Sequence, residues 1–180
     1  MTGVAYEATI ASPHFDELPI PVTSRTPLAG FAELYERHYE AVFRAALRVT
    51  GNPADAEDVL QTVFLRALSR GEDAAGVATP SAYFRRAAVN AAVDVLRRRE
   101  LHAESIYDDR AHTVQPSLLL KERLRRAIAV LDSEDASLFL LRHVEGFSNE
   151  ELAGMFEIEK NNVAVRLHRI RQRLQVEMER

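Results

Sequence analysis

"FSNEELAGMFEIEKNNVAVRLHRIRQRL", residues 147–174, carries the most informative pattern in the chain. Ser148, followed three positions later by Glu151, forms a capping-box pattern that predicts the start of a short helix through Phe156. A tight turn follows, and a second, longer helix is expected over about 161–177. A short helix, a turn and a longer basic helix are the parts of a helix-turn-helix, whose second helix lies in the major groove of DNA.

The sign of the charge reverses within this stretch. Every charged residue from 145 to 159 is an acid, whereas no acid occurs from 160 to 176. Arg166, Arg169 and Arg173 repeat along one side of the expected helix, and a solvated helix face normally mixes both signs at this spacing. The pattern favours contact with phosphates. The alternative is that the run is only the solvated face of a last helix.

The composition predicts an all-α fold. The 180 residues include 7 Gly and 7 Pro, which is few for an all-β chain rich in turns, and 47% are hydrophobic. Ala, Leu, Arg and Glu dominate, and these residues favour helices. The net charge of -4 argues against a general polyanion binder, but a phosphate backbone responds to local charge, not to net charge.

Cellular location is predicted from what the sequence lacks. It contains no Cys, which excludes disulfides, thiolate metal sites and a cysteine nucleophile and fits a reducing compartment. No apolar run approaches the roughly 20 residues that a membrane span needs, and the N-terminus has no secretory pattern. We therefore expect a cytoplasmic protein without membrane insertion.

The hydrophobic period divides the chain into four parts. Residues 1–27 contain scattered Pro and no sustained period, which predicts a mobile or extended N-terminal arm. Residues 28–99 predict a first helical domain, and residues 100–116, where the period is lost, predict a linker. Residues 117–180 predict a second helical domain that contains the helix-turn-helix. Further helices are expected over 31–50, 53–69, 80–99, 118–131 and 133–144.

The second expected helix begins with "DAEDVLQTVF", residues 55–64. If its apolar stripe points inward, Asp58, Gln61 and Leu65 share the outward face, with Asp55 one turn earlier. These acids either complement the helix dipole or form a binding face, and both interpretations stay open at this point. The apolar Leu65 on a polar face slightly favours a protein contact.

The third expected helix carries a surplus of arginine. Arg86, Asn90, Asp94 and Arg97 fall at i, i+4, i+8 and i+11 and therefore line one stripe. Ordinary surface ion pairs between Asp94 and its neighbours are one interpretation. The other is phosphate contact, because Asp94 is the only acid that five arginines meet along this helix.

No pattern of catalysis or of cofactor binding is found. The glycines form no phosphate loop or dinucleotide fingerprint, and no Gly-x-Ser-x-Gly elbow is present. The six His show no spacing typical of metal ligands. The sequence therefore predicts a protein that is not an enzyme and that takes no metal or cofactor.

Three longer stretches carry a family resemblance: "LYERHYEAVFRAALRVTGNPADAEDVLQTVFLRA", "SAYFRRAAVNAAVDVLRRR" and "LDSEDASLFLLRHVEGFSNEELAGMF". The first two resemble region two, and the third with the basic helix resembles region four, of bacterial RNA polymerase sigma factors in the extracytoplasmic-function (ECF) group of the sigma-70 family. The similarity spans residues 31–174. It implies a transcription initiation factor that binds core RNA polymerase and directs it to specific promoters.

The resemblance also implies sites in region two. The face that docks on the clamp helices of the polymerase's largest subunit would comprise Asp55, Glu57, Asp58, Gln61 and Leu65. The loop over 70–80 corresponds to the loop that captures a flipped base of the minus-ten element. The melted strand would be held beside it by Arg86, Asn90, Asp94, Arg97 and Arg98.

Region four of the family reads the minus-thirty-five element in the major groove. The sequence departs from the family pattern here, because Ala164 and Val165 stand where a basic residue and Ser are usual, and Glu157 replaces a turn residue. The remaining candidates for this contact are Lys160, Asn161, Asn162, Arg166, His168 and Arg169.

Two other functions are compatible with parts of the sequence. A conventional helix-turn-helix regulator would bind duplex DNA alone, but the acidic helix face and the asymmetric layout count against it. A sigma-like decoy would keep the fold and bind DNA or partners without supporting initiation, and the altered groove positions leave it open. The resemblance further implies an anti-sigma protein as a partner, one that wedges the two domains apart or covers their faces.

Overall fold

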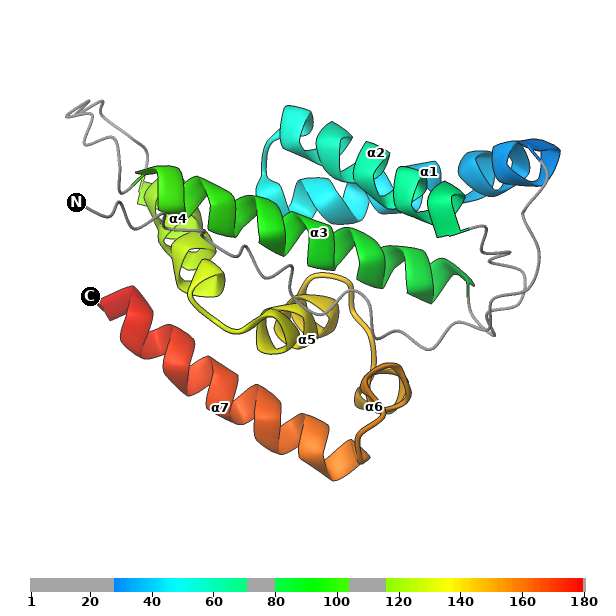
Figure 1. Ribbon diagram of the computed structural model, residues 1–180. Helices are drawn as coiled ribbons and strands as arrows, with labels where there is room; N and C mark the ends of the chain where they lie inside the picture. Colours follow the sequence, from blue (N-terminus) through cyan, green and yellow to red (C-terminus); the bar gives the residue numbers. More distant parts are fainter. Residues whose placement is uncertain (1–27, 71–79, 104–115, 180) are drawn as a thin grey trace, which may run out of the picture.

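Residues 28–70, 80–103 and 116–179 are described by the computed structural model, and all of their regular structure is helical (Figure 1). This confirms the predicted all-α fold. The arm 1–27, the loop 71–79 and most of the predicted linker lie outside the described residues. The helices are α1 (Leu28–Thr50), α2 (Pro53–Arg70), α3 (Pro80–Ala103), α4 (Pro116–Ala129), α5 (Ser133–His143), α6 (Asn149–Phe156) and α7 (Lys160–Glu179).

The first domain consists of α1, α2 and α3. Gly51 joins α1 to α2 with a φ of 67°, a left-handed conformation that is easy for glycine. Asn52 then caps α2, since its side-chain oxygen accepts a hydrogen bond from the N–H of Ala54 at 2.8 Å. Phe64 of α2 stacks on Phe84 of α3 with ring centroids 5.3 Å apart. The cap and the aromatic core fix α2 and α3 side by side.

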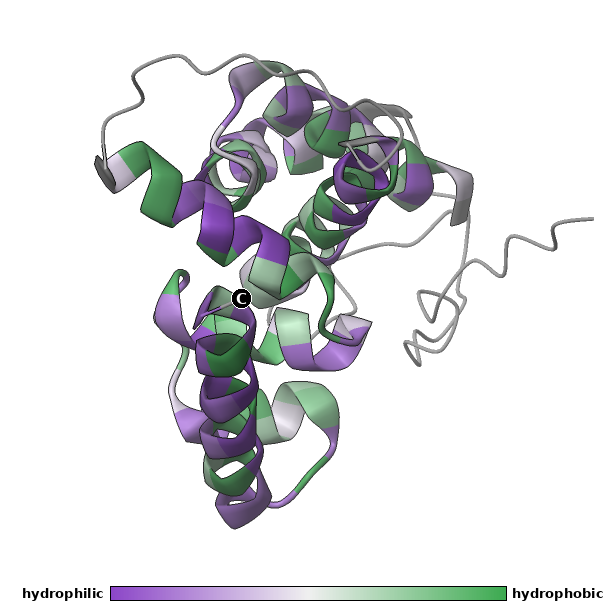
Figure 2. Cartoon of the chain, turned by 90° about the vertical axis from the view of Figure 1, so that its left-hand side faces the viewer, coloured by the Kyte–Doolittle hydropathy of each residue, from purple (hydrophilic) through white to green (hydrophobic). Residues whose placement is uncertain are grey.

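The second domain consists of α4 to α7 and ends in the helix-turn-helix formed by α6 and α7. The Ser148 hydroxyl accepts from the N–H of Glu151 at 3.2 Å, and the Glu151 carboxylate accepts from the N–H of Ser148 at 2.7 Å. This confirms the predicted capping box. Glu157 ends α6 in the left-handed region, with a φ of 53°. Hydrophilic and hydrophobic residues alternate along α7, as expected for a helix with one buried side (Figure 2).

The two domains pack together along α3. In Figure 1, α3 runs between the α1–α2 pair and the second domain, and it contacts both α4 and α5. Phe84 of α3 is in the core of the first domain, yet Val89 and Val93 on the opposite half of the helix are also buried. The helix also continues to Ala103, beyond the expected end at Arg99. None of the described helices is both long enough and apolar enough to cross a membrane.

Candidate functional site

The outer face of α2 presents most of the residues expected to bind core polymerase. Glu57, Asp58 and Gln61 are exposed, and Leu65 is 64% exposed although it is apolar. Leu68, one turn further along, is exposed as well. Exposed leucines beside carboxylates suit a protein partner that offers both apolar and basic groups.

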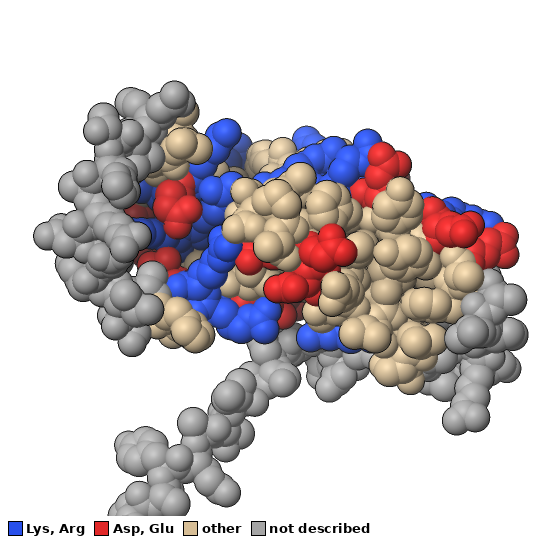
Figure 3. Space-filling view, turned by 90° about the horizontal axis from the view of Figure 1, so that it is seen from above, with Lys and Arg blue, Asp and Glu red and all other residues tan. Residues whose placement is uncertain are grey.

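Asp55 does not share this face. Its side chain is 16% exposed and pairs with Arg99 of α3, with 2.5 Å between carboxylate and guanidinium. This close ion pair holds the start of α2 against α3, and the low exposure of the carboxylate leaves little of it for a partner. On the side of the molecule that α2 covers, the acidic groups form separate clusters, not one continuous patch (Figure 3).

Arg97 of α3 is fully engaged with the second domain. Its Nε donates to the carbonyl of Ala129 at 3.3 Å, and its two terminal nitrogens donate to the carbonyl of Leu131 and the hydroxyl of Ser133. All three guanidinium nitrogens therefore have partners around the turn between α4 and α5.

Arg86 of α3 reaches the helix-turn-helix. It donates to the carbonyl of Met155, and its guanidinium lies over the Phe156 ring, 4.4 Å from the centroid. Burial lowers the pKa of Arg86, and the carboxylates of Glu134 and Glu157 offset part of that effect. The contact joins the middle of the first domain to the end of α6.

Asn90 and Asp94 lie on the same stripe of α3. The Ser137 hydroxyl donates to the side-chain oxygen of Asn90 at 2.5 Å. Asp94 is half-buried, and this burial raises its pKa against the opposing effect of Arg97. Of the five residues predicted to hold the minus-ten strand, Arg98 is the exposed one.

An interdomain ion-pair cluster centres on Glu145, which the sequence patterns did not single out as a site. Its side chain is 2% exposed, and its carboxylate pairs with Arg48 of α1 at 2.9 Å and with Arg85 of α3 at 2.7 Å. Arg85 also lies over the Phe147 ring, 4.3 Å from the centroid. The carboxylate is buried, whereas the side chains of Arg48 and Arg85 are 51% and 27% exposed, so each pair stabilises the contact less than a fully buried pair would. No sequence spacing links these residues, which lie far apart in the chain.

The residues expected to contact DNA on α7 mostly face solvent. Lys160 is exposed and pairs with Glu150 of α6 at 3.1 Å, a surface pair of little energetic worth. Ala164 and Val165 are also exposed and interrupt this polar surface with apolar groups. The other exposed candidates are Asn161, Asn162, His168 and Arg169.

Arg166 differs from its neighbours on α7. Its guanidinium donates to Asp135 at 2.5 Å and to Glu134 at 2.7 Å, both in α5, and its side chain is 29% exposed. Burial lowers the pKa of Arg166, but the hydrogen bonds to Glu134 and Asp135 outweigh this effect and raise the pKa above its ordinary value. Arg166 therefore fastens α7 to α5 and has only part of its guanidinium available to DNA.

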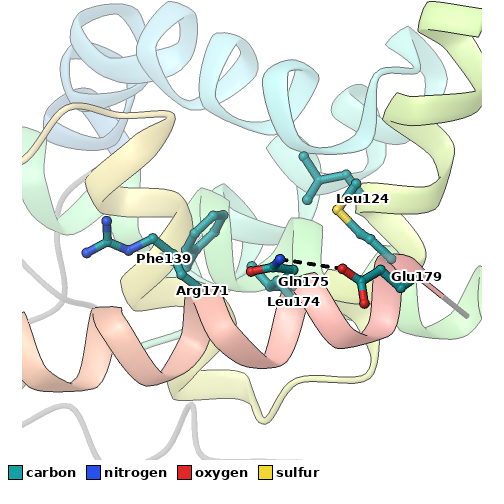
Figure 4. Close-up of a pocket in the computed structure, with 7 residues that line it drawn as sticks. Leu124, Phe139, Arg171, Leu174, Gln175 and Glu179 are labelled. Carbon is teal, nitrogen blue, oxygen red and sulfur yellow. Dashed lines mark hydrogen bonds between the residues drawn. The ribbon is translucent and has the colours of Figure 1, made fainter.

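An apolar pocket lies between α4, α5 and α7 (Figure 4). Leu124, Phe139, Leu174 and Met178 supply its walls, and none of them belongs to the predicted contact residues. Arg171, Gln175 and Glu179 of α7 also line it, and the apolar walls suit the packing of an apolar group.

Each of the two domains matches a known protein family. The family described as "Sigma-70 region 2" matches residues 34–101, and the family described as "Sigma-70, region 4" matches residues 121–174. The first match covers the helices that carry the α2 face and the arginine-rich stripe, and the second covers the helix-turn-helix. The chain belongs to the sigma-70 family of RNA polymerase sigma factors.

Named relatives place the sigma factor in the ECF group. It is 31% identical over 156 residues to "RNA polymerase sigma-E factor" of Streptomyces avermitilis, covering 83% of this chain and 85% of the relative. It is 28% identical over 149 residues to "ECF RNA polymerase sigma factor SigM" of Mycobacterium tuberculosis, covering 81% of this chain and 75% of the relative. The sigma factor is thus a transcription initiation factor that directs RNA polymerase to promoters.

A solved structure, that of CnrH in complex with the cytosolic domain of CnrY, has a similar fold. The TM-score is 0.51 at 22% sequence identity, and the similarity covers 83% of the sigma factor and 87% of that chain. At this identity the similarity supports the fold, and the functional assignment depends on the sequence relatives.

Proposed function

We propose that the sigma factor binds core RNA polymerase through the exposed face of α2, holds the melted minus-ten strand with α3 and contacts the minus-thirty-five element with α7. One observation carries the proposal: Glu57, Asp58, Gln61 and Leu65 lie together on the solvent side of a helix that matches region 2. A rigid helix with carboxylates around an exposed leucine is complementary to a basic partner surface.

For the minus-ten element, the proposed donors are Arg86, Asn90, Arg97 and Arg98, with Asp94 on the same stripe. Arginine and amide groups along one helix can follow the backbone of a single strand without reading every base. Residues 71–79, where the resemblance implies capture of a flipped base, lie outside the described residues.

For the minus-thirty-five element, the proposed contacts are Lys160, Asn161, Asn162, His168 and Arg169, with a partial contribution from Arg166. Ala164 and Val165 can pack on a thymine methyl but cannot hydrogen-bond to a base edge. We therefore expect α7 to bind mainly through phosphates, with fewer base contacts than the family usually makes.

The remaining assignments follow from family membership. We propose that the sigma factor has no catalytic activity of its own, acts in the cytoplasm and has an anti-sigma protein as a further partner. Its contribution to initiation is binding energy, since it positions the polymerase on a promoter and holds the opened strand.

The α2 face is tested by Asp58→Arg. The substitution places positive charge against a basic partner, so affinity for core polymerase is expected to fall about a hundredfold or more, measured by fluorescence anisotropy of labelled sigma factor. Because Asp58 is exposed, the thermal unfolding midpoint should change little. Glu36→Arg on α1 is the matched control, since Glu36 is also exposed and the charge change is identical. Unchanged affinity of the Asp58 variant for core would remove the α2 assignment.

Run-off transcription separates the proposal from its two rivals. The sigma factor with core polymerase should produce defined transcripts from a promoter that core alone does not use. A conventional regulator would bind duplex DNA without core and produce none. A decoy would bind core polymerase and yield no start site on any genomic template.

A further inference from the structure

Val165 lies at the centre of the solvent side of α7. Its side chain is 50% exposed although it is apolar. The buried stripe of the helix, which packs on the rest of the second domain, consists of Val163, Leu167, Ile170 and Leu174. With about 3.6 residues per turn, position 165 falls opposite this stripe. Figure 1 shows α7 at the edge of the second domain, where its solvent side is open to a large ligand.

The residues around Val165 on this surface are all polar. Those one turn before it are Asn161 and Asn162, and those one turn after it are His168 and Arg169. All four are exposed, and no acid occurs from residue 160 to residue 176. This ring of hydrogen-bonding groups on a basic helix suits the polar edges and phosphates of DNA, whereas its apolar centre needs an apolar partner.

The direction of Val165 is fixed by contacts on the other sides of α7. Arg166, the next residue, donates to the carboxylates of Asp135 at 2.5 Å and Glu134 at 2.7 Å, both in α5. Together with the buried stripe, these bonds prevent α7 from rotating about its axis. Ala164, on the other side of Val165 in the chain, is exposed and adds no hydrogen-bonding side chain. The helix therefore presents an apolar group at a defined position.

The chemistry of the major groove determines which base this group fits. Base pairs present hydrogen-bond donors and acceptors there and one apolar group, the C5-methyl of thymine. Against a donor or acceptor, a valine side chain would displace water without replacing its hydrogen bond. Against the methyl, both apolar groups leave water. We propose that Val165 selects a thymine in the minus-thirty-five element by contact with its C5-methyl. This inference rests on the proposed function of α7 and specifies the base that the helix prefers.

The preference is tested first by selection from a pool of duplexes with a random segment. Duplexes that are retained by the full-length factor with core polymerase, and not by core alone, are sequenced. We expect an enriched element with a position at which thymine dominates. Val165→Ser should lose the preference at this position and keep the others, because a serine hydroxyl can donate to or accept from any base edge.

The methyl group itself is tested with deoxyuridine, which pairs with adenine as thymidine does and lacks only the C5-methyl. Replacing the selected thymidine by deoxyuridine should lower the affinity of the wild-type factor with core polymerase about fourfold, the contribution of one buried methyl group. Val165→Ser should bind both duplexes equally. The measurement is fluorescence anisotropy of the labelled duplex.

Val176→Ser is the matched control. Val176 is also exposed on α7, at 53%, and undergoes the same substitution. It lies three turns nearer the C-terminal end, whereas the N-terminal part of a recognition helix contacts the base edges. This variant should therefore discriminate thymidine from deoxyuridine as the wild type does. Because both valines are exposed, neither variant should change the thermal unfolding midpoint by more than a few degrees.

The possible outcomes separate this inference from the proposed function. Equal affinity of the wild type for the two duplexes would overturn the inference, as would unchanged discrimination in Val165→Ser. Weaker binding of Val165→Ser to core polymerase, with the discrimination intact, would assign Val165 to a protein contact instead. An enriched element without a thymine that depends on Val165 would overturn the inference alone. If no element is enriched over core alone, the proposed function fails and the inference fails with it.

Discussion

The two helices proposed to bind DNA, α3 and α7, have similar charge patterns and different surroundings. Both carry repeated arginines with few acids, which led to the same expectation for each. In the structure, α3 lies between two domains with most of its candidate residues half-buried, whereas most candidates on α7 face solvent. A charge pattern thus indicates what a helix can bind, while tertiary packing decides when that surface is available.

The same difference in packing decides whether an arginine contributes mainly to the stability of the fold or mainly to DNA binding. The guanidinium of Arg97 satisfies main-chain carbonyls between domains, but Arg169 on α7 is exposed. The same substitution should therefore have a large effect on folding in one helix and a small one in the other.

Arg97→Ala should have the largest effect on stability. It leaves the carbonyls of Ala129 and Leu131 without their donor, so we expect the free energy of unfolding to fall by about 2–4 kcal/mol in urea titrations. Arg98→Ala, the next residue and exposed, should change it by less than about 0.5 kcal/mol. Equal effects of the two substitutions would mean that α3 is not covered in solution.

Arg166→Ala should have an intermediate effect on stability and should also affect DNA binding. Loss of its partly exposed hydrogen bonds to Glu134 and Asp135 should lower the free energy of unfolding by about 1–2 kcal/mol. It should also weaken binding to minus-thirty-five duplex DNA and reduce the salt slope, read by anisotropy at several salt concentrations.

Arg169→Ala provides the comparison for Arg166 on the same helix. Because Arg169 is exposed, its removal should lower DNA affinity and reduce the salt slope by about one without a measurable change in stability. If neither substitution changes affinity or slope, α7 has only a solvated basic face.

The smallest predicted effect concerns pH and a histidine in the first domain. His38 is buried against Phe84, with ring centroids 4.8 Å apart, and burial together with nearby Arg37 lowers its pKa. The neutral ring is thus favoured in the folded state. Its contribution to stability is present above the ordinary pKa of about 6.5 and is lost as pH falls through the lower folded value.

The free energy of unfolding should therefore decrease from pH 7 to pH 5, and His38→Gln should make this decrease shallower. The compared quantity is the slope of the free energy of unfolding against pH. A loss of stability that is the same at every pH does not change this slope. His143→Gln serves as the parallel test in the second domain, since burial and then Arg171 and Arg142 lower the pKa of His143. An identical slope in wild type and both variants would contradict the lowered pKa of both rings in the folded state.

Much of the fold could be predicted from local sequence. Helix positions followed from hydrophobic period, and the capping box at Ser148 and the cap at Asn52 are local hydrogen bonds with recognisable residue patterns. The end of α3 was placed too early, at Arg99, because the helix continues into polar residues where the period is weak. The spacing of residues along the chain did not predict the contact between the domains. Val89 and Val93 on the second side of α3 are buried there, and their apolar character was the one signal of that contact in the sequence.

The candidate surfaces were predictable to differing degrees. Exposure of Glu57, Asp58 and Leu65 agrees with a helix whose opposite stripe is apolar. Asp55 was expected on the same face, but its pairing with Arg99 depends on how α2 crosses α3. The Glu145 cluster likewise joins residues distant in the chain, and sequence spacing carries no information about such pairs.

This sigma factor directs core polymerase to start at specific promoters. The most direct measurement is sequencing of the transcripts made by the purified factor with core polymerase on genomic DNA. We predict discrete start sites that are absent with core alone and that share sequence elements about ten and thirty-five base pairs upstream, and these sites should disappear with Asp58→Arg. Start sites identical to those of core alone would mean that the sigma factor does not select promoters.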